Sequence, residues 1–152
     1  MATVALSERD RRIRLSVYEH FVAHGRPPSV AESAAALGIA DGDARAAYHR
    51  LHEGHALFLE PGTDDIRMAN PLSAVPTPYR VTIGDHTLWA NCAWDSLGIP
   101  AMLHADAWID AIFAHAGETT TYRIEAGVLR DGEGIVHFPL PFRRWYDDLI
   151  HT

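Results

Sequence analysis

One short stretch of the sequence places a thiol and a carboxyl group where both could act on the same substrate. Cys92 and Asp95 lie three residues apart within residues 88–100, LWANCAWDSLGIP. On a helix this spacing puts both side chains on one face, roughly 5–6 Å apart at Cβ. Asn91 is a suitable N-cap, which would place Cys92 in the first helical turn. Backbone N–H groups and the helix dipole at that position favour a thiolate.

Two anionic groups this close repel each other, so we expect the Cys92–Asp95 pair to share one proton. Such a pair would serve a reaction that needs one nucleophile and one proton donor. A buried, unreactive cysteine beside an ordinary acidic residue has the same spacing, because free cysteines are often buried and inert. The spacing alone therefore establishes only that the two groups can meet.

Three further side chains are candidates for the walls of a substrate pocket. Trp89 and Trp94 flank Cys92 and could enclose an organic group. His137 lies in the apolar run 135–138, IVHF, and could line the same pocket. Ordinary packing is the competing interpretation, since aromatic residues near a helix start and hydrogen-bonded histidines in strands are common in protein cores.

Composition narrows the class of protein. The chain has 152 residues, which suits one domain or two small lobes with a sizeable core. Cys92 is the only cysteine, which excludes an intramolecular disulfide and any zinc site that needs two cysteines. The formal net charge of −7 argues against a broad phosphate-binding surface. We find no secretory signal and no apolar run of about 18 residues, so we expect a cytoplasmic protein without a membrane span.

Helix signals dominate residues 1–69. Capping patterns, apolar periodicity and terminal glycines predict three helices. Two short apolar runs, 56–59 and 66–68, surround a Pro/Gly/Asp turn and predict a β-hairpin. Three helices followed by a hairpin are typical of a winged-helix lobe. The helices are expected from Ser7 to Gly25, from the Ser29–Glu32 capping box to Gly38, and from an Asp41 or Asp43 cap to Gly54.

Residues 70–78 contain three prolines and predict an extended linker, which we take as a lobe boundary. Residues 79–152 then predict a mixed lobe of strands and helices. The expected fold is α+β: a winged-helix-like lobe at 1–69 and a sheet-and-helix lobe at 79–152. Within the second lobe we expect a hairpin of 79–83 and 86–90, a helix over 91–103 with Pro100 as a break or kink, strands at 108–113, 119–125 and 135–138, a turn within 127–134, and a helix at 143–149.

The segment LWANCAWDSLGIPAML, residues 88–103, resembles the alkylmercury lyase (organomercurial lyase) family. In that family an aromatic-Ala-x-Cys-Ala-x-Asp stretch leads into an apolar helix that ends near a proline. The order of elements is similar too, with a winged-helix-like lobe, a short linker and a hairpin before the cysteine helix. The resemblance covers roughly residues 10–150, although only the cysteine segment is specific. Residues 137–141 and 144–148 look like the later region of broader lyase-like members.

The resemblance implies an activity and two roles. Cys92 would attack the mercury of R–Hg⁺ as a thiolate, and Asp95 would protonate the carbon as the Hg–C bond breaks. Soft thiolates select soft metals, and a nearby carboxylic acid can protonate a leaving carbanion. Mercury would be bound by Cys92 as part of the substrate, and no cofactor is expected. The substrate would be a small organometallic or organic molecule.

This chain departs from the family pattern in one important respect. The family has a second active-site cysteine in its C-terminal part, and no residue here matches it. In many lyase-like relatives a cysteine and a further strand follow about where this chain ends, at Thr152. With one thiol, release of Hg(II) would be less assisted, so Asp95, His137 or an external thiol would have to substitute. We expect weak lyase activity or a different reaction in the same pocket.

Three other functions stay open at this point. The chain could be a lyase-like enzyme of secondary metabolism that uses Cys92 and Asp95 on a metal-free substrate. It could be a sensor that binds a soft metal ion without turnover. The winged-helix-like lobe also suggests a DNA-binding regulator, but residues 45–52 offer few basic side chains and acidic residues surround them, so a nucleic-acid partner is not expected. The sequence assigns no oligomeric state.

Overall fold

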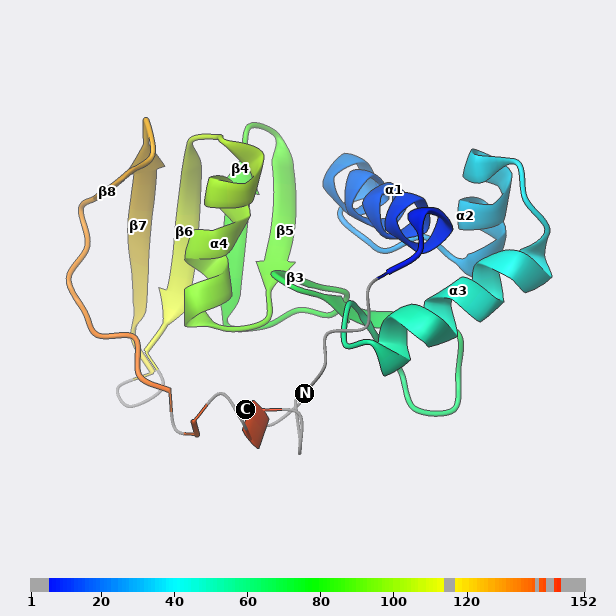
Figure 1. The fold of residues 1–152 in the computed structure, drawn as a ribbon. Helices are drawn as coiled ribbons and strands as arrows, with labels where there is room; N and C mark the ends of the chain where they lie inside the picture. The colour runs from blue at the N-terminus through cyan, green and yellow to red at the C-terminus, as the bar shows by residue number, and fades with distance from the viewer. Residues whose placement is uncertain (1–5, 114–116, 139, 142–143, 146–152) are drawn as a thin grey trace.

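The computed structural model describes residues 6–113, 117–138, 140–141 and 144–145 of the chain. It has four α-helices and one eight-stranded antiparallel sheet in this part, which confirms the α+β class. Figure 1 shows helices α1–α3 gathered at one end of the sheet and α4 lying across its central strands. The bounds of the helices are α1 Glu8–His24, α2 Val30–Leu37, α3 Asp41–Glu53 and α4 Ala93–Leu103.

The first two helices begin and end where their capping residues predict. The Ser7 side chain accepts a hydrogen bond from the Asp10 backbone N–H, and α1 ends at Gly25 in the left-handed conformation. Ser29 and Glu32 form the expected capping box at the start of α2. The cap expected for α3 is wrong: its N-cap is Ala40, without a side-chain hydrogen bond. Asp41 and Asp43 instead lie in the first turn of α3, where they complement the helix dipole.

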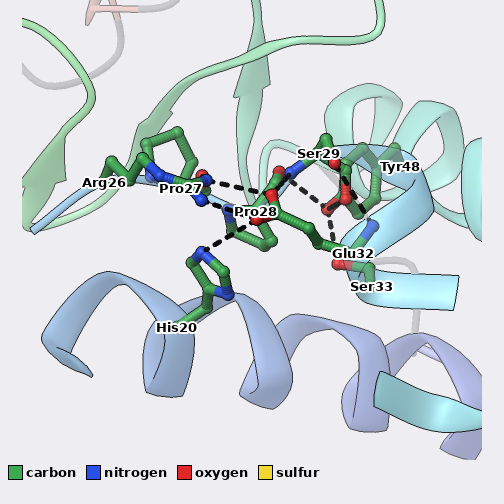
Figure 2. Close-up of polar contacts among 8 residues, drawn as sticks. All are labelled: His20, Arg26, Pro27, Pro28, Ser29, Glu32, Ser33 and Tyr48. Carbon is green, nitrogen blue, oxygen red and sulfur yellow. Dashed lines mark hydrogen bonds and ion pairs between the residues drawn. The ribbon is translucent and has the colours of Figure 1, made fainter. Parts of the chain in front are cut away.

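Polar contacts join α1, α2 and α3 around the start of α2 (Figure 2). Arg26 donates two hydrogen bonds to the Glu32 carboxylate, at 2.9 and 2.6 Å, and the Ser29 backbone N–H donates a third at 2.8 Å. The buried Tyr48 hydroxyl lies 2.7 Å from the Ser33 hydroxyl, so α3 is joined to α2 by a satisfied internal hydrogen bond. The helices therefore pack in a fixed arrangement beside the sheet.

The strand order in the sheet is β1-β2-β3-β5-β4-β6-β7-β8, and each neighbouring pair is antiparallel. Both predicted hairpins, β1–β2 and β4–β5, are confirmed. Residues 70–78 are not a plain linker, because β3 lies within them and hydrogen-bonds to both β2 and β5. The strands are β1 Phe58–Leu59, β2 Ile66–Ala69, β3 Leu72–Ser73, β4 Tyr79–Ile83, β5 His86–Ala90, β6 Ala107–Ile112, β7 Thr119–Glu125 and β8 Val128–Arg130.

The division into lobes at 1–69 and 79–152 stays a prediction, as does the winged-helix assignment of the first lobe. The two parts share one hydrophobic core. Val17 and Phe21 of α1 and Leu51 of α3 belong to the same buried cluster as Leu88 and Ile109 of the central strands. Removal of so many apolar side chains from water is the main source of stability for an arrangement of this kind.

One face of the sheet receives α4. On the other, which we call the open face, the described side chains of β4, β6 and β7 are half-buried or exposed. Val81, Leu88 and Ile109 are fully buried together with Ile99 of α4. Residues at alternating positions point to the opposite face. There Arg80 pairs with Asp110, and the exposed Trp108 ring lies under the Arg123 guanidinium. The site described below lies on the α4 face.

Two expectations for the C-terminal part differ from the structure. Residues 135–138 form no strand; β8, Val128–Arg130, pairs with β7, and residues 135–138 line the cavity described below instead of pairing with the outer edge of β8. The segment 127–134, for which the sequence predicts a turn, also contains β8, Val128–Arg130. The helix expected at 143–149 falls outside the described residues except for 144–145. In Figure 1 the segment after β8, in orange, runs back below the end of the sheet at which β5 ends.

Candidate functional site

Cys92 occupies the junction between β5 and α4. The strand ends at Ala90, and α4 begins at Ala93. Cys92 itself is the N-cap, so the expectation that Asn91 caps the helix is wrong. The Cys92 Sγ accepts a hydrogen bond from the Asp95 backbone N–H at 3.4 Å, as a capping serine hydroxyl would. The thiol therefore lies over the first turn of α4, directly beside the side chain of Asp95.

The Asp95 side chain contacts both residues that precede the helix. Its Oδ2 accepts a hydrogen bond from the Asn91 side-chain amide at 3.3 Å. Its carboxyl group also lies close enough to the Cys92 thiol for each to affect the pKa of the other. The same Asn91 amide donates to Asn70 Oδ1 at 2.9 Å. The structure thus brings together the two residues that the sequence singled out, and it adds Asn91 as the residue that orients the carboxylate.

Burial changes the acidity of both groups. Burial raises the pKa of the Cys92 thiol, and the Asp95 carboxylate adds to the increase, although the backbone N–H groups of Asp95 and Trp94 oppose it. Burial also raises the pKa of the Asp95 carboxyl, against the hydrogen bonds from Asn91 and Cys92. The expectation of a thiolate favoured by the helix start is therefore wrong in direction, because desolvation outweighs the helix N-terminus. Both groups hold protons more tightly than they would in water.

A cavity of about 660 Å³ opens above this pair. Cys92 and Asp95 line it together with Trp94 and His137, so four of the five predicted site residues meet there. His137 lies on an exposed segment rather than in a strand. Trp89 is not among the described residues that line the cavity. It alternates with the buried Leu88 and Ala90 on β5 and so points to the open face of the sheet.

Sequence reasoning missed two tyrosines in the wall of this cavity. Tyr79 begins β4, and Tyr122 lies on β7. Burial raises the pKa of the Tyr79 phenol, and the nearby Cys92 raises it further. Only strand pairing across β4, β6 and β7 places these side chains on the face covered by α4. No short-range pattern in the sequence could have indicated it.

A segment without regular structure, residues 131–138, forms one wall of the cavity; we call it the strap. The Tyr122 hydroxyl donates to the Glu133 carbonyl at 3.0 Å, and Arg123 pairs with Asp131 at 3.2 Å. The Tyr122 ring also lies against Gly132, where a Cβ would come within 1.8 Å of the Tyr122 Cδ1 atom. Gly132 therefore lets the strap lie against the ring, because any larger residue would have to displace one of them.

Gly132→Ala is expected to detach the strap from Tyr122. Trypsin cleavage after the exposed Arg130 should become several-fold faster, while the midpoint of global unfolding should change little, because the strap contributes little to the core. Gly42→Ala is the matched control, since a Cβ there meets no atom within 4 Å. It should leave cleavage unchanged and stabilise α3 by about 0.5–1 kcal/mol. Equal cleavage rates in the Gly132 variant and the wild type would contradict the assigned contact.

The raised pKa of Asp95 predicts how stability depends on pH. Ionised Asp95 is disfavoured in the folded state, so Asp95→Asn should stabilise the protein at pH 7. The gain should decline as pH falls below the raised pKa of Asp95 in the folded state. It should vanish below the unfolded-state pKa near ~3.9, because both states then hold the proton.

Asp110→Asn should instead destabilise the protein at pH 7, because Arg80 lowers the pKa of Asp110 in the folded state. That change should cost up to about 1 kcal/mol at pH 7. Urea unfolding at pH 7 and pH 3.5 tests both signs.

The residues described by the structure provide no resident metal centre. No three His, Cys, Asp or Glu side chains converge among them as a possible ligand group. Cys92 and Asp95 are a pair of one soft and one hard donor, with an open cavity beside them. None of the described helices is long and apolar enough to cross a membrane.

Comparisons with known proteins agree with this geometry. The family model described as alkylmercury lyase (MerB) matches residues 72–149, just over half of the chain, including the Cys92–Asp95 turn and the strap. No curated protein matches the sequence. Among solved structures, the mercury-bound form of MerB2 is similar in fold, with a TM-score of 0.69 and 22% sequence identity. The match covers 83% of this chain and 60% of the MerB2 chain, so the chain spans less than two thirds of the length of that protein. The chain belongs to the alkylmercury lyase family.

Proposed function

We propose that this chain cleaves carbon–mercury bonds by protonolysis, with Cys92 as the mercury ligand and Asp95 as the proton donor. The observation that carries the proposal is the Cys92–Asp95 pair, joined by the hydrogen bond from the Asp95 backbone N–H to the Cys92 Sγ, in the wall of a mainly apolar cavity. A soft thiol sulfur binds mercury, and the organic group is accommodated by apolar walls. Family membership supports the same reaction.

The first step exchanges the ligand on mercury. The Cys92 thiol gives up its proton and its sulfur displaces the outgoing ligand X from R–Hg–X, which forms Cys92–S–Hg–R and HX. Mercury lowers the cost of this ionisation because it replaces the proton on sulfur, so the raised pKa of the free thiol does not prevent binding. Asn91 holds the Asp95 carboxyl beside the same sulfur.

The second step breaks the Hg–C bond. Asp95 in its protonated form transfers the proton to the carbon bound to mercury, R leaves as R–H, and Asp95 becomes a carboxylate beside the Cys92-bound Hg(II). The raised pKa of Asp95 helps here, because the carboxyl group retains its proton at a higher pH than an exposed aspartic acid would. The resulting carboxylate can stabilise the cationic mercury until another ligand arrives.

External thiols complete the cycle in this proposal. One small thiol protonates Asp95 and binds mercury as a thiolate. A second returns a proton to Cys92 and removes mercury as Hg(SR′)₂. Because Cys92 is the only cysteine, small thiols take the part that a second protein cysteine would have. We therefore expect turnover to depend strongly on thiol concentration.

The contacts of α3 support a small-molecule substrate over a nucleic-acid partner. Arg45 and His49 both contact Asp64, at 2.6 and 2.9 Å. Arg50 pairs with Asp10 at 2.6 Å. These are three of the four basic side chains expected on a recognition helix, and carboxylates of this chain already pair with both arginines. The fourth, His52, accepts a hydrogen bond from the Leu59 backbone N–H. Little positive charge remains on this helix to attract phosphates.

Benzene release from phenylmercury acetate in excess small thiol tests the proposal. Folded protein should release benzene faster than thiol alone, and the rate should rise with thiol concentration. Tight binding of phenylmercury at Cys92 without benzene release would instead favour a soft-metal-binding sensor. If folded protein neither bound phenylmercury nor released benzene, mercury chemistry would be excluded. That result would favour a reaction of the same pair on a metal-free substrate.

A further inference from the structure

Three aromatic side chains meet at the mouth of the cavity; we call them the aromatic cluster, Trp94, Phe138 and Trp145. The rings of Trp94 and Phe138 are in edge-to-face contact, with centroids 6.2 Å apart. Phe138 and Trp145 are stacked, with centroids 5.2 Å apart. The Trp145 indole N–H donates to the Leu140 carbonyl at 2.9 Å, which fixes the orientation of this ring. All three line the same cavity as Cys92 and Asp95.

The aromatic cluster belongs to a larger exposed apolar surface around that mouth. The Trp94 side chain is 57% exposed although it directly precedes Asp95 on α4. Most of the large apolar side chains that are exposed in the described part of the chain line this one cavity. Exposed apolar surface of this extent is costly in water unless a ligand or partner covers it. Besides Trp94 and Phe138, these residues are Ile112, Phe113, Leu129, Ile135 and Val136.

The position of the aromatic cluster relative to Asp95 indicates what covers it. In the proposed function, the carbon that receives the proton must lie beside the Asp95 carboxyl. A methyl group ends at that carbon. A larger group extends further into the cavity, whose mouth is formed by Trp94, the residue before Asp95 on α4, and by Phe138 from the strap. Flat apolar groups gain most from aromatic walls of this kind, through edge-to-face and stacked contacts.

We propose that the aromatic cluster binds the organic group of the substrate and makes the enzyme selective for aryl and other large, flat apolar groups over methyl. This proposal rests on the proposed function and specifies its substrate class. Trp94 has the main role, because it combines the most exposed aromatic surface with the position nearest to Asp95 in the chain. Phe138 supports Trp94 from the strap through their edge-to-face contact.

The experiment compares phenylmercury acetate with methylmercury chloride in the full chain and in Trp94→Ala. The kcat/KM for benzene and methane release is measured in the same excess of small thiol. Affinity for both compounds is measured separately by thiol competition in an Asp95→Asn background, which should bind without cleaving. Truncation of Trp94 should lower the phenyl-to-methyl ratio about five- to tenfold in both measurements, which corresponds to the loss of one aromatic contact.

Two further variants separate selectivity from damage to the fold. Trp94→Phe should retain most of the wild-type ratio, because a flat ring remains beside Phe138. Trp108→Ala is the matched control, since Trp108 is 53% exposed, contacts Arg123 on the open face of the sheet and does not line the cavity. It should leave the ratio unchanged. Far-UV circular dichroism and urea unfolding check that each variant is folded.

The outcomes for the two proposals are distinct. Action on both compounds with the same phenyl-to-methyl ratio in wild type and Trp94→Ala would overturn the role of the aromatic cluster and leave the proposed function standing. If folded wild-type protein neither bound nor cleaved either compound, that result would overturn both the proposed function and the role of the aromatic cluster. A ratio that falls equally in Trp108→Ala would also overturn the assignment, because that residue lies outside the cavity.

Discussion

Cys92→Ser is expected to abolish mercury binding and benzene release while leaving the fold intact. The serine hydroxyl is nearly isosteric with the thiol and is a preferred N-cap acceptor for the Asp95 backbone N–H. Unfolding free energy should therefore stay within about 1 kcal/mol of the wild-type value. The hydroxyl is a hard ligand that does not retain mercury. Benzene release should fall on the order of a thousandfold or more, as when other enzymes lose their nucleophile.

Separate measurements of folding and of mercury binding make this test decisive. Urea unfolding measures whether the serine preserves the stability that the N-cap provides. Competition with a small thiol for phenylmercury measures whether the side chain at position 92 still binds mercury. A serine variant that is folded and still releases benzene within tenfold of the wild-type rate would show that mercury binds elsewhere. Because the chain has no other cysteine, residual binding in this variant could not be attributed to another protein thiol.

Asp95→Asn should separate binding from bond cleavage. The amide keeps the size of the side chain and can still accept the hydrogen bond from Asn91, so phenylmercury should bind at Cys92 with little change in affinity. An amide N–H is far too weakly acidic to protonate carbon, so the rate of benzene release should fall about a hundred- to ten-thousandfold, the range typical of a lost general acid. In the wild type the rate should also decline as pH rises through the raised pKa of Asp95. The variant should lack that decline.

A second aspartate provides the matched control for that experiment. Asp110 pairs with Arg80 on the open face of the sheet, away from the cavity. Asp110→Asn should leave benzene release within twofold of wild type. Single-turnover measurements with stoichiometric phenylmercury distinguish a slow chemical step from slow mercury removal. If Asp95→Asn retained the wild-type single-turnover rate, another group would have to supply the proton.

Local sequence signals predicted much of this molecule because their physical causes are local. Ser7 caps α1, and the Ser29–Glu32 capping box begins α2, since each satisfies backbone N–H groups within three residues. The spacing of Cys92 and Asp95 brought thiol and carboxyl together because a helical turn has a fixed geometry. The α+β class followed from the same kind of evidence, the periodicity and terminal glycines of three helices and the short apolar runs of the strands.

Non-local contacts decided the rest. Burial, which depends on packing between distant segments, reversed the expected direction of the Cys92 pKa. Strand pairing set which tryptophan lines the cavity: Trp89 points to the open face of the sheet, whereas Trp94 on α4 lies at the cavity mouth. Residues 135–138 have an apolar pattern suited to a strand, but β8 is the strand that pairs with β7, and residues 135–138 line the cavity. The sequence by itself determined that Cys92 and Asp95 lie side by side and where α1 and α2 begin and end. Only the tertiary structure determined the acidity of the pair and the residues around it, because desolvation and strand pairing depend on segments far apart in the chain.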